Sequence, residues 1–234
     1  MTVTPIMANV KENLEALRQR IDQAAQRSGR SGADVTLVAV TKSASLPAIL
    51  EAREAGVQFF AENRIQDAQE KIPAVQGATW HLIGHLQTNK IKPALELFQC
   101  LQSLDSVRLA EEVNAQLLTL GRVLPVMLEV NISGEKQKFG FEPEKIYSAV
   151  DEIKKLTQLD VCGVMGIAPN TDDVEARRAS FKKLKGVFTV LKGMKGERFQ
   201  MKYLSMGMSD DFETAIEEGS NMVRVGRALF ARRK

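Results

Sequence analysis

Residues 34–42 read DVTLVAVTK, a run in which β-branched and other apolar side chains follow one another with little alternation. Strands that are buried on both faces have this composition, and they occur mainly in parallel sheets. From Ser45 the chain takes up a helical pattern. We therefore expect a buried strand that ends at Lys42 and is followed by a crossover helix.

The same alternation of strand and helix continues along the chain. Further strands are expected at 57–61, 79–84, 98–103, 123–132, 159–167, 201–206 and 222–225, and helices around 64–75, 88–97, 107–118, 143–156, 173–191 and 211–218. Eight such units predict an α/β fold, a single (β/α)8 TIM barrel, because parallel neighbours need long return connections. An open doubly wound sheet is the alternative, but it would leave edge strands with an alternating polar face, and no such strand is evident.

An extra helix precedes the first strand. Apolar residues recur at helical spacing over residues 10–24, after Thr4 and Pro5 as a cap and first turn, and the pattern ends near residues 28–29. No linker or low-complexity segment interrupts the sequence. We expect one domain over residues 1–234, with residues 1–30 forming an N-terminal helix that packs on the barrel.

Composition excludes several classes of protein. Of the 234 residues, 44% are hydrophobic and 26% charged, which excludes a disordered, collagen-like or disulfide-stapled chain. The net charge of +3 is matched by residues 232–234 alone, so no basic stripe for nucleic acid is expected. Neither a secretory signal nor a membrane span is evident. Cys100 and Cys162 lack metal-ligand spacing, so we expect buried thiols in a cytoplasmic protein.

Residues at the carboxyl ends of barrel strands carry the chemistry of this fold. Lys42 is one of them, and its ammonium must be solvated, paired or neutralised there. Desolvation lowers the pKa of a lysine and gives the neutral amine that attacks a carbonyl. The alternative is a lysine that extends to the barrel mouth and pairs with Glu62 or Asp67.

A candidate anion site follows the seventh strand. Residues 205–211 read SMGMSDD, in which Ser205, Gly207 and Ser209 supply hydroxyls and a close backbone approach at the start of a helix. The alternative is that Ser209 is an ordinary helix cap followed by acids that suit the helix dipole. Those acids would also oppose a phosphate placed very close.

The eighth strand adds Arg224, which alternates with apolar neighbours and should point into the barrel mouth. Gly226 and Arg227 follow where phosphate sites recur in this fold. The alternative for Arg224 is a structural ion pair with Glu62 or Glu129. No metal site is expected, because neither histidine of the run at 80–86 stands in a zinc motif, and Lys138 lies in a charged loop that is typically solvated.

These segments together resemble a known family. The carriers of the resemblance are VAVTK at 38–42, FAENRIQDAQEK at 60–71, WHLIGHLQTNK at 80–90, KFG at 138–140, SMGMSDDFETAI at 205–216 and GSNMVRVGRALF at 219–230. As an ordered set that covers nearly the whole chain, they resemble the YggS/PROSC family of pyridoxal phosphate homeostasis proteins.

The resemblance implies a type III pyridoxal 5′-phosphate (PLP) barrel, similar to the N-terminal domain of alanine racemase. It implies PLP as an aldimine on Lys42, lined by Asn63, with Arg224 facing the pyridine nitrogen. Ser209, Gly226 and the backbone at Arg227 fall on the phosphate-binding positions. Arg227 stands where many members have threonine. We expect its amide to bind phosphate, with the guanidinium either paired to the phosphate or turned outward.

The resemblance also bears on activity. An arginine at the ring nitrogen disfavours its protonation and weakens the electron sink, and packing explains the positions of both tyrosines, Tyr147 and Tyr203. We therefore expect a monomeric carrier that holds PLP reversibly, delivers it to apo PLP-dependent enzymes and serves PLP homeostasis without strong catalysis. A weak PLP-dependent amino-acid racemase is the alternative, and a regulatory protein that has lost its cofactor is a third possibility.

Overall fold

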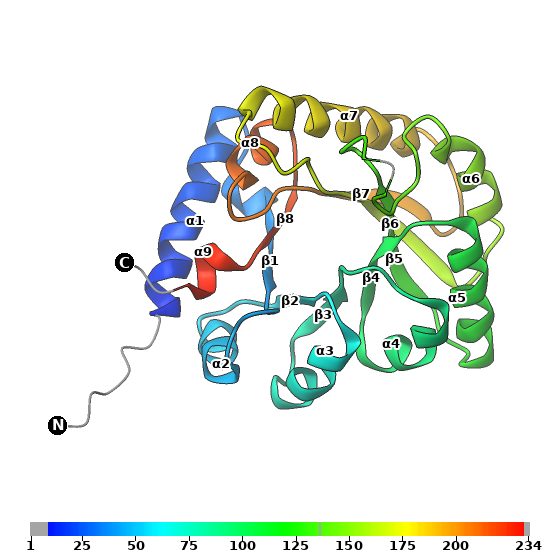
Figure 1. Ribbon diagram of the computed structural model, residues 1–234, viewed down its shortest axis with the longest axis horizontal. Helices are drawn as coiled ribbons and strands as arrows, with labels where there is room; N and C mark the ends of the chain where they lie inside the picture. The colour runs from blue at the N-terminus through cyan, green and yellow to red at the C-terminus, as the bar shows by residue number, and fades with distance from the viewer. Residues whose placement is uncertain (1–8, 136, 232–234) are drawn as a thin grey trace.

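The computed structural model describes residues 9–135 and 137–231. In these residues eight parallel strands pair in sequence order, and β8 (Met222–Val225) pairs with β1 (Thr36–Val40), so the sheet closes into a barrel (Figure 1). The predicted TIM barrel is confirmed. The open doubly wound sheet is excluded, because that topology would leave β1 and β8 unpaired with each other.

Each strand is followed by helical structure on the outside of the barrel. The remaining strands are β2 (Phe59–Glu62), β3 (Thr79–Leu82), β4 (Cys100–Leu104), β5 (Leu124–Val130), β6 (Leu159–Gly166) and β7 (Phe199–Ser205). The helices are α1 (Val10–Arg27), α2 (Leu46–Glu54), α3 (Ile65–Lys71), α4 (Ile91–Leu97), α5 (Val107–Thr119), α6 (Ile146–Ile153), α7 (Val174–Lys192), α8 (Phe212–Glu217) and α9 (Arg227–Phe230), with short 3₁₀ turns at Gly32–Asp34, Ile72–Ala74 and Thr88–Lys90.

The element boundaries differ from the sequence expectation by up to a few residues. The first strand was expected over 34–42, yet it ends at Val40, so Lys42 lies two residues beyond it. The apolar run itself ends at Val40, and Thr41 and Lys42 belong to the turn that follows the strand. The second helix starts as expected, with Ser45 at its N-cap and a proline in its first turn.

The strands separate two apolar regions. Outward-facing side chains such as Ala39, Leu128 and Val164 join the main core beneath the helices. Inward-facing side chains form a smaller cluster that fills the barrel and includes Cys100 and Cys162. Both cysteines are free and buried, as expected, and a hydrogen bond with Cys162, together with burial, raises the pKa of the Cys100 thiol.

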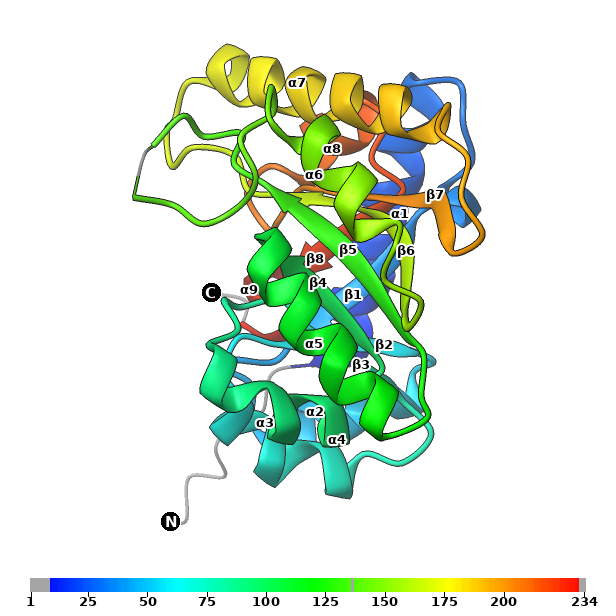
Figure 2. The ribbon, with the colours of Figure 1, turned by 90° about the vertical axis from the view of Figure 1, so that its right-hand side faces the viewer.

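The first helix covers the seam where the barrel closes. Helix α1 begins after Asn9, whose side chain accepts a hydrogen bond from the amide of Glu12 at 3.1 Å. Thr4 and Pro5, the expected start, lie outside the described residues. The apolar face of α1 packs against α8 and α9 (Figures 1 and 2). Buried Asn13 donates to the carbonyls of Leu229 and Ala231 at 3.0 and 3.1 Å, which anchors α9.

In residues 9–135 and 137–231, no helix combines the length and the apolar character that a bilayer crossing requires.

Candidate functional site

The residues expected to carry chemistry gather at one end of the barrel. Lys42 follows β1, Asn63 follows β2 directly, and Gly226 follows β8 directly. Because all strands are parallel and β1 pairs with both β2 and β8, these three positions share the carboxyl-end mouth. A Cβ atom built on Gly226 would lie 2.9 Å from the carbonyl oxygen of Val40, which shows how closely the turn after β8 approaches β1.

Lys42 has an exposed side chain at this mouth. The buried carboxylate of Glu62 is engaged elsewhere, because Lys71 donates to it at 2.6 Å and the Thr41 hydroxyl at 2.5 Å. Within the described part of the chain, Lys42 forms no ion pair with either Glu62 or Asp67. The structure therefore shows neither of the two arrangements that the sequence left open, a desolvated amine or a lysine paired with Glu62 or Asp67. The amine is instead open to solvent and to a ligand.

Arg224 is the buried cation of the site. Its guanidinium donates to the Ser205 hydroxyl at 2.8 Å and to the Gly166 carbonyl at 3.0 Å, and only 3% of the residue is exposed. Burial lowers the pKa of Arg224 to about 10, against the opposing charges of Asp211 and Glu129. No direct ion pair with Glu129 forms, so neutral acceptors hold this arginine in place.

A chain of hydrogen bonds continues from Arg224 across the barrel interior. Ser205, which accepts from Arg224, donates its own proton to the side-chain oxygen of Gln102 at 2.7 Å. The amide nitrogen of Gln102 lies 2.7 Å from Nδ1 of His81. Burial lowers the pKa of His81 to about 4, so the ring is neutral near pH 7 and Nδ1 accepts the bond. Ser205 therefore contributes to the site by fixing Arg224.

The turn after β7 forms a tight backbone cradle. Gly207 has φ of +95°, and a Cβ there would lie 2.6 Å from that of Ala215, so only glycine fits. The Ser209 hydroxyl accepts from the amide of Ala228 at 3.2 Å, which ties this turn to the start of α9. The cap of α8 is Asp211 and not Ser209, so the ordinary-cap alternative for Ser209 does not hold.

Arg227 and its acidic neighbours are arranged so that negative charge near the cradle is offset. The guanidinium of Arg227 is largely exposed and pairs with Asp210. The Asp211 carboxylate accepts from the amide of Met208 at 2.6 Å, and burial raises the pKa of Asp211. The side chain of Arg227 thus turns outward, while its amide, at the first position of α9, has no acceptor within the helix.

Four residues at the mouth were not expected from sequence as parts of the site. Nδ1 of His85 lies 2.7 Å from the Asp105 carboxylate, and the His85 ring stacks on Phe139 with centroids 3.6 Å apart. Glu129 points inward from β5, and burial, with a smaller contribution from Asp105, raises its pKa to about 7. The described residues contain no cluster of ligands for a metal ion.

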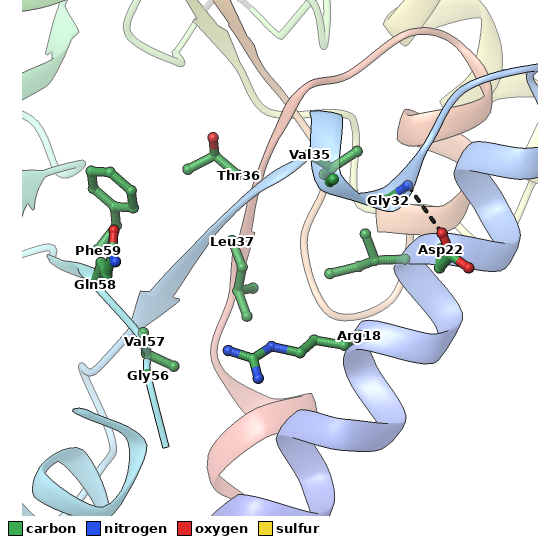
Figure 3. Close-up of a pocket in the computed structure, with 12 residues that line it drawn as sticks. Arg18, Asp22, Gly32, Val35, Thr36, Leu37, Gly56, Val57, Gln58 and Phe59 are labelled. Atoms are coloured by element: carbon green, nitrogen blue, oxygen red, sulfur yellow. Dashed lines mark hydrogen bonds between the residues drawn. The ribbon is translucent and has the colours of Figure 1, made fainter. Parts of the chain in front are cut away.

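A separate cavity lies away from this mouth. It has a volume of about 470 Å³ and lies between α1 and the amino ends of β1 and β2, with Arg18, Leu37 and Phe59 among its lining residues (Figure 3). None of the residues expected to carry chemistry lines it. Catalytic and cofactor sites of this fold occupy the opposite end of the barrel, so the mouth is the candidate functional site.

Comparison with known proteins places the chain in a family. A family model described as "Alanine racemase, N-terminal domain" matches residues 13–233. A pyridoxal phosphate homeostasis protein of Haemophilus influenzae is 37% identical over 229 residues, covering 96% of each chain. The chain belongs to the pyridoxal phosphate homeostasis protein family. The family resemblance expected from the sequence motifs is confirmed.

Solved structures agree with this membership in the pyridoxal phosphate homeostasis protein family. PipY of Synechococcus elongatus, solved without PLP, superposes with a TM-score of 0.85 at 32% identity over 95% of this chain and 100% of PipY. The same protein with PLP bound gives 0.82 at 31% identity. Alanine racemase of Clostridium difficile gives 0.73 at 17% identity, with 57% of that chain covered, which shows the shared barrel fold alone.

Proposed function

We propose that this chain binds PLP at the barrel mouth and acts in PLP homeostasis as a reversible carrier. The observation that carries the proposal is the arrangement of three features at one mouth. The exposed amine of Lys42 matches the aldehyde of PLP. The guanidinium of Arg224, held by neutral acceptors, matches the pyridine nitrogen, and the glycine-lined cradle closed by Ser209 matches the phosphate. The PLP-bound structure of the relative PipY supports the same assignment.

The residues fit the cofactor chemically. Gly207 and Gly226 let the turns after β7 and β8 pack closely against Ala215 and Val40, where a Cβ would clash. The Ser209 hydroxyl accepts from Ala228, so its proton can be donated to an anion. Asn63 supplies an amide at the mouth, and the Arg227 side chain does not crowd the cradle, because it pairs with Asp210.

PLP supplies an electron sink when bound, and the protein decides how far it is used. Arg224 remains a cation even with its lowered pKa. A cation facing the ring nitrogen disfavours protonation there and limits carbanion chemistry. Ser205 and Gln102 hold Arg224 in this orientation. These groups favour holding and releasing the cofactor over catalysing a demanding reaction.

Absorbance followed by borohydride reduction and peptide mass mapping tests the proposal. The PLP-loaded protein should show a visible band, and reduction should lock a pyridoxyl group onto the peptide that contains Lys42. Lys42→Ala should abolish both signals. Lys138→Ala is the matched control, because Lys138 lies near the mouth but pairs with Glu135 at 2.5 Å. Modification scattered over surface lysines, or equal loss in both variants, would reject the proposal.

A weak amino-acid racemase is the second candidate, and one observation favours it. Glu129 lies at the mouth with a pKa of about 7, which suits a group that exchanges protons at neutral pH. Against it, Tyr203 lines a cavity at the opposite end of the barrel and Tyr147 packs beside the main core, so neither offers a base at the mouth. Turnover of a pure enantiomer that disappears in both Lys42→Ala and Glu129→Gln would establish the racemase instead.

Further aspects of the carrier proposal concern its setting. We propose that the chain works as a single domain and a monomer in the cytoplasm, with apo PLP-dependent enzymes as acceptors. Support for the monomer comes from the site itself, because the residues that fit PLP all come from one chain. Sedimentation of the loaded protein, together with transfer of PLP to an apo-enzyme, would test both points.

A further inference from the structure

A second pocket opens at the same mouth, beside the proposed cofactor site. It has a volume of about 340 Å³, within the usual range for small-molecule sites. It lies between the segment that follows β2 and the segment that follows β3. Its polar lining residues are Asn63, Arg64, Gln66, His85, Gln87 and Lys90. These belong to the motifs at 60–71 and 80–90, of which the proposed cofactor role uses only Asn63.

The charge of this pocket is one-sided. Arg64 and Lys90 contribute two cations, and none of the residues that line the pocket is acidic. Lys90 is only partly exposed, and in the described residues its ammonium has no ion-pair partner. A partly buried ammonium without a counter-charge is unfavourable, so the pocket favours an anion.

His85 gives the pocket an aromatic ring held in a fixed orientation. Asp105 holds Nδ1 of the ring at 2.7 Å, and Phe139 stacks on the ring face at an interplanar angle of 8°. Because Nδ1 is taken by the carboxylate, the other ring nitrogen remains for a ligand. The side-chain amides of Gln66 and Gln87 add hydrogen-bond donors, and Leu82 adds an apolar wall. The pocket therefore combines charge, directed donors and an apolar surface.

We propose that this basic pocket binds the phosphate group of a small phosphate monoester, so that the mouth holds a noncovalent phosphate ligand beside the covalent one. A monoester fits better than a bare ion, because Leu82 gives the organic part an apolar contact while Arg64 and Lys90 meet the phosphate. This proposal depends on the proposed function in one respect, because it assumes that PLP fills the adjacent site. For a carrier, such a pocket would receive phosphorylated vitamers that enter or leave.

The test uses protein whose cofactor has been locked by borohydride, so that the first site is closed. Pyridoxine 5′-phosphate, which has no aldehyde, is titrated into this protein by calorimetry, with glycerol 3-phosphate and inorganic phosphate in parallel. Arg64→Gln and Lys90→Gln remove the two cations. Lys92→Gln is the matched control, because Lys92 is exposed nearby on α4 and does not line the pocket.

The expected result is one further equivalent of pyridoxine 5′-phosphate bound per chain. Binding should weaken by about tenfold or more in each pocket variant, the usual effect of losing a charge-assisted hydrogen bond, and should be unchanged in Lys92→Gln. If glycerol 3-phosphate binds as tightly as pyridoxine 5′-phosphate, the pocket still binds phosphate monoesters but does not select for the pyridine ring. Inorganic phosphate that binds as tightly as both esters would overturn it.

Two other outcomes separate this inference from the proposed function. No further binding to the locked protein, or binding that ignores Arg64 and Lys90, would overturn the pocket assignment and leave the carrier proposal intact. If mass mapping finds no pyridoxyl group on Lys42, the carrier proposal fails. The same titration then decides on the pocket alone. The pocket assignment holds if Lys92→Gln still binds one equivalent of pyridoxine 5′-phosphate and the Arg64 and Lys90 variants do not, and it fails if all three variants bind alike.

Discussion

Two groups inside the barrel, the buried His81 and the half-buried Glu129, should make opposite contributions to stability as the pH falls from 7 to 5. Burial lowers the pKa of His81 to about 4, against an ordinary value of 6.5. Between these values the unfolded chain binds more protons than the folded protein, so acid destabilises the fold. Burial raises the pKa of Glu129 from 4.5 to about 7. There the folded protein binds more protons, so acid stabilises the fold.

The two effects are similar in size. From pH 7 to pH 5, His81 should remove about 2 kcal/mol of unfolding free energy and Glu129 should add about 2 kcal/mol. In the wild-type protein they should nearly cancel. Glu129→Gln removes the stabilising effect and exposes the loss due to His81. His81→Asn keeps an acceptor for Gln102 and exposes the gain due to Glu129.

Urea unfolding of the cofactor-free protein at pH 7 and pH 5 measures this directly. Relative to wild type, Glu129→Gln should lose about 2 kcal/mol more on acidification, His81→Asn about 2 kcal/mol less, and the double variant should follow wild type. Other titrating groups contribute equally to all four proteins and drop out of the comparison. If both single variants change with pH as wild type does, the assignment of buried, oppositely shifted groups is wrong.

Three further changes test individual contacts. Gly207→Ala should lower stability by about 1–3 kcal/mol, measured by urea unfolding, because φ is positive and the new methyl meets Ala215 at 2.6 Å. Asn13→Ala should lower the melting temperature and cost about 1–3 kcal/mol, because two carbonyls at the end of α9 lose their buried donor; no change would contradict the anchoring role. Arg227→Ala should change PLP affinity by less than about twofold by fluorescence titration, because this exposed side chain pairs with Asp210; a tenfold loss would show that the guanidinium reaches the phosphate.

The barrel could be predicted from the sequence because each of its units is local. A buried run such as that at 34–42 and the helix after it are readable within about 20 residues, and their repetition leaves few topologies. Strand ends were less well predicted, because Thr41 and Lys42 were included in the first strand although the apolar run stops at Val40. The cap of α1 at Asn9 was missed, because a single asparagine is a short signal; the expected start at Thr4 and Pro5 lies outside the described residues.

The site was predictable in its positions and less so in its contacts. Lys42 and Arg224 stand out because a charge at the end of an apolar strand is rare. The partners of Arg224 were missed, since Ser205 and Gln102 are joined across the barrel and are separated by 103 residues in sequence. A signal did exist: Gln102 is a long polar side chain in β4, a strand whose residues are all buried. A fully buried side-chain amide is usually hydrogen-bonded to another buried polar group.

The position of α1 has a consequence for how the chain folds. Helix α1 precedes all eight strands in the chain, yet its apolar face is covered by α8 and α9, which follow β7 and β8. Contacts of such long sequence separation raise contact order and slow folding. The strand–helix units between them can form neighbouring contacts as they emerge, whereas the turn that joins β8 to α9 assembles only at closure. Acquisition of ligand affinity during synthesis should therefore report the final step of folding.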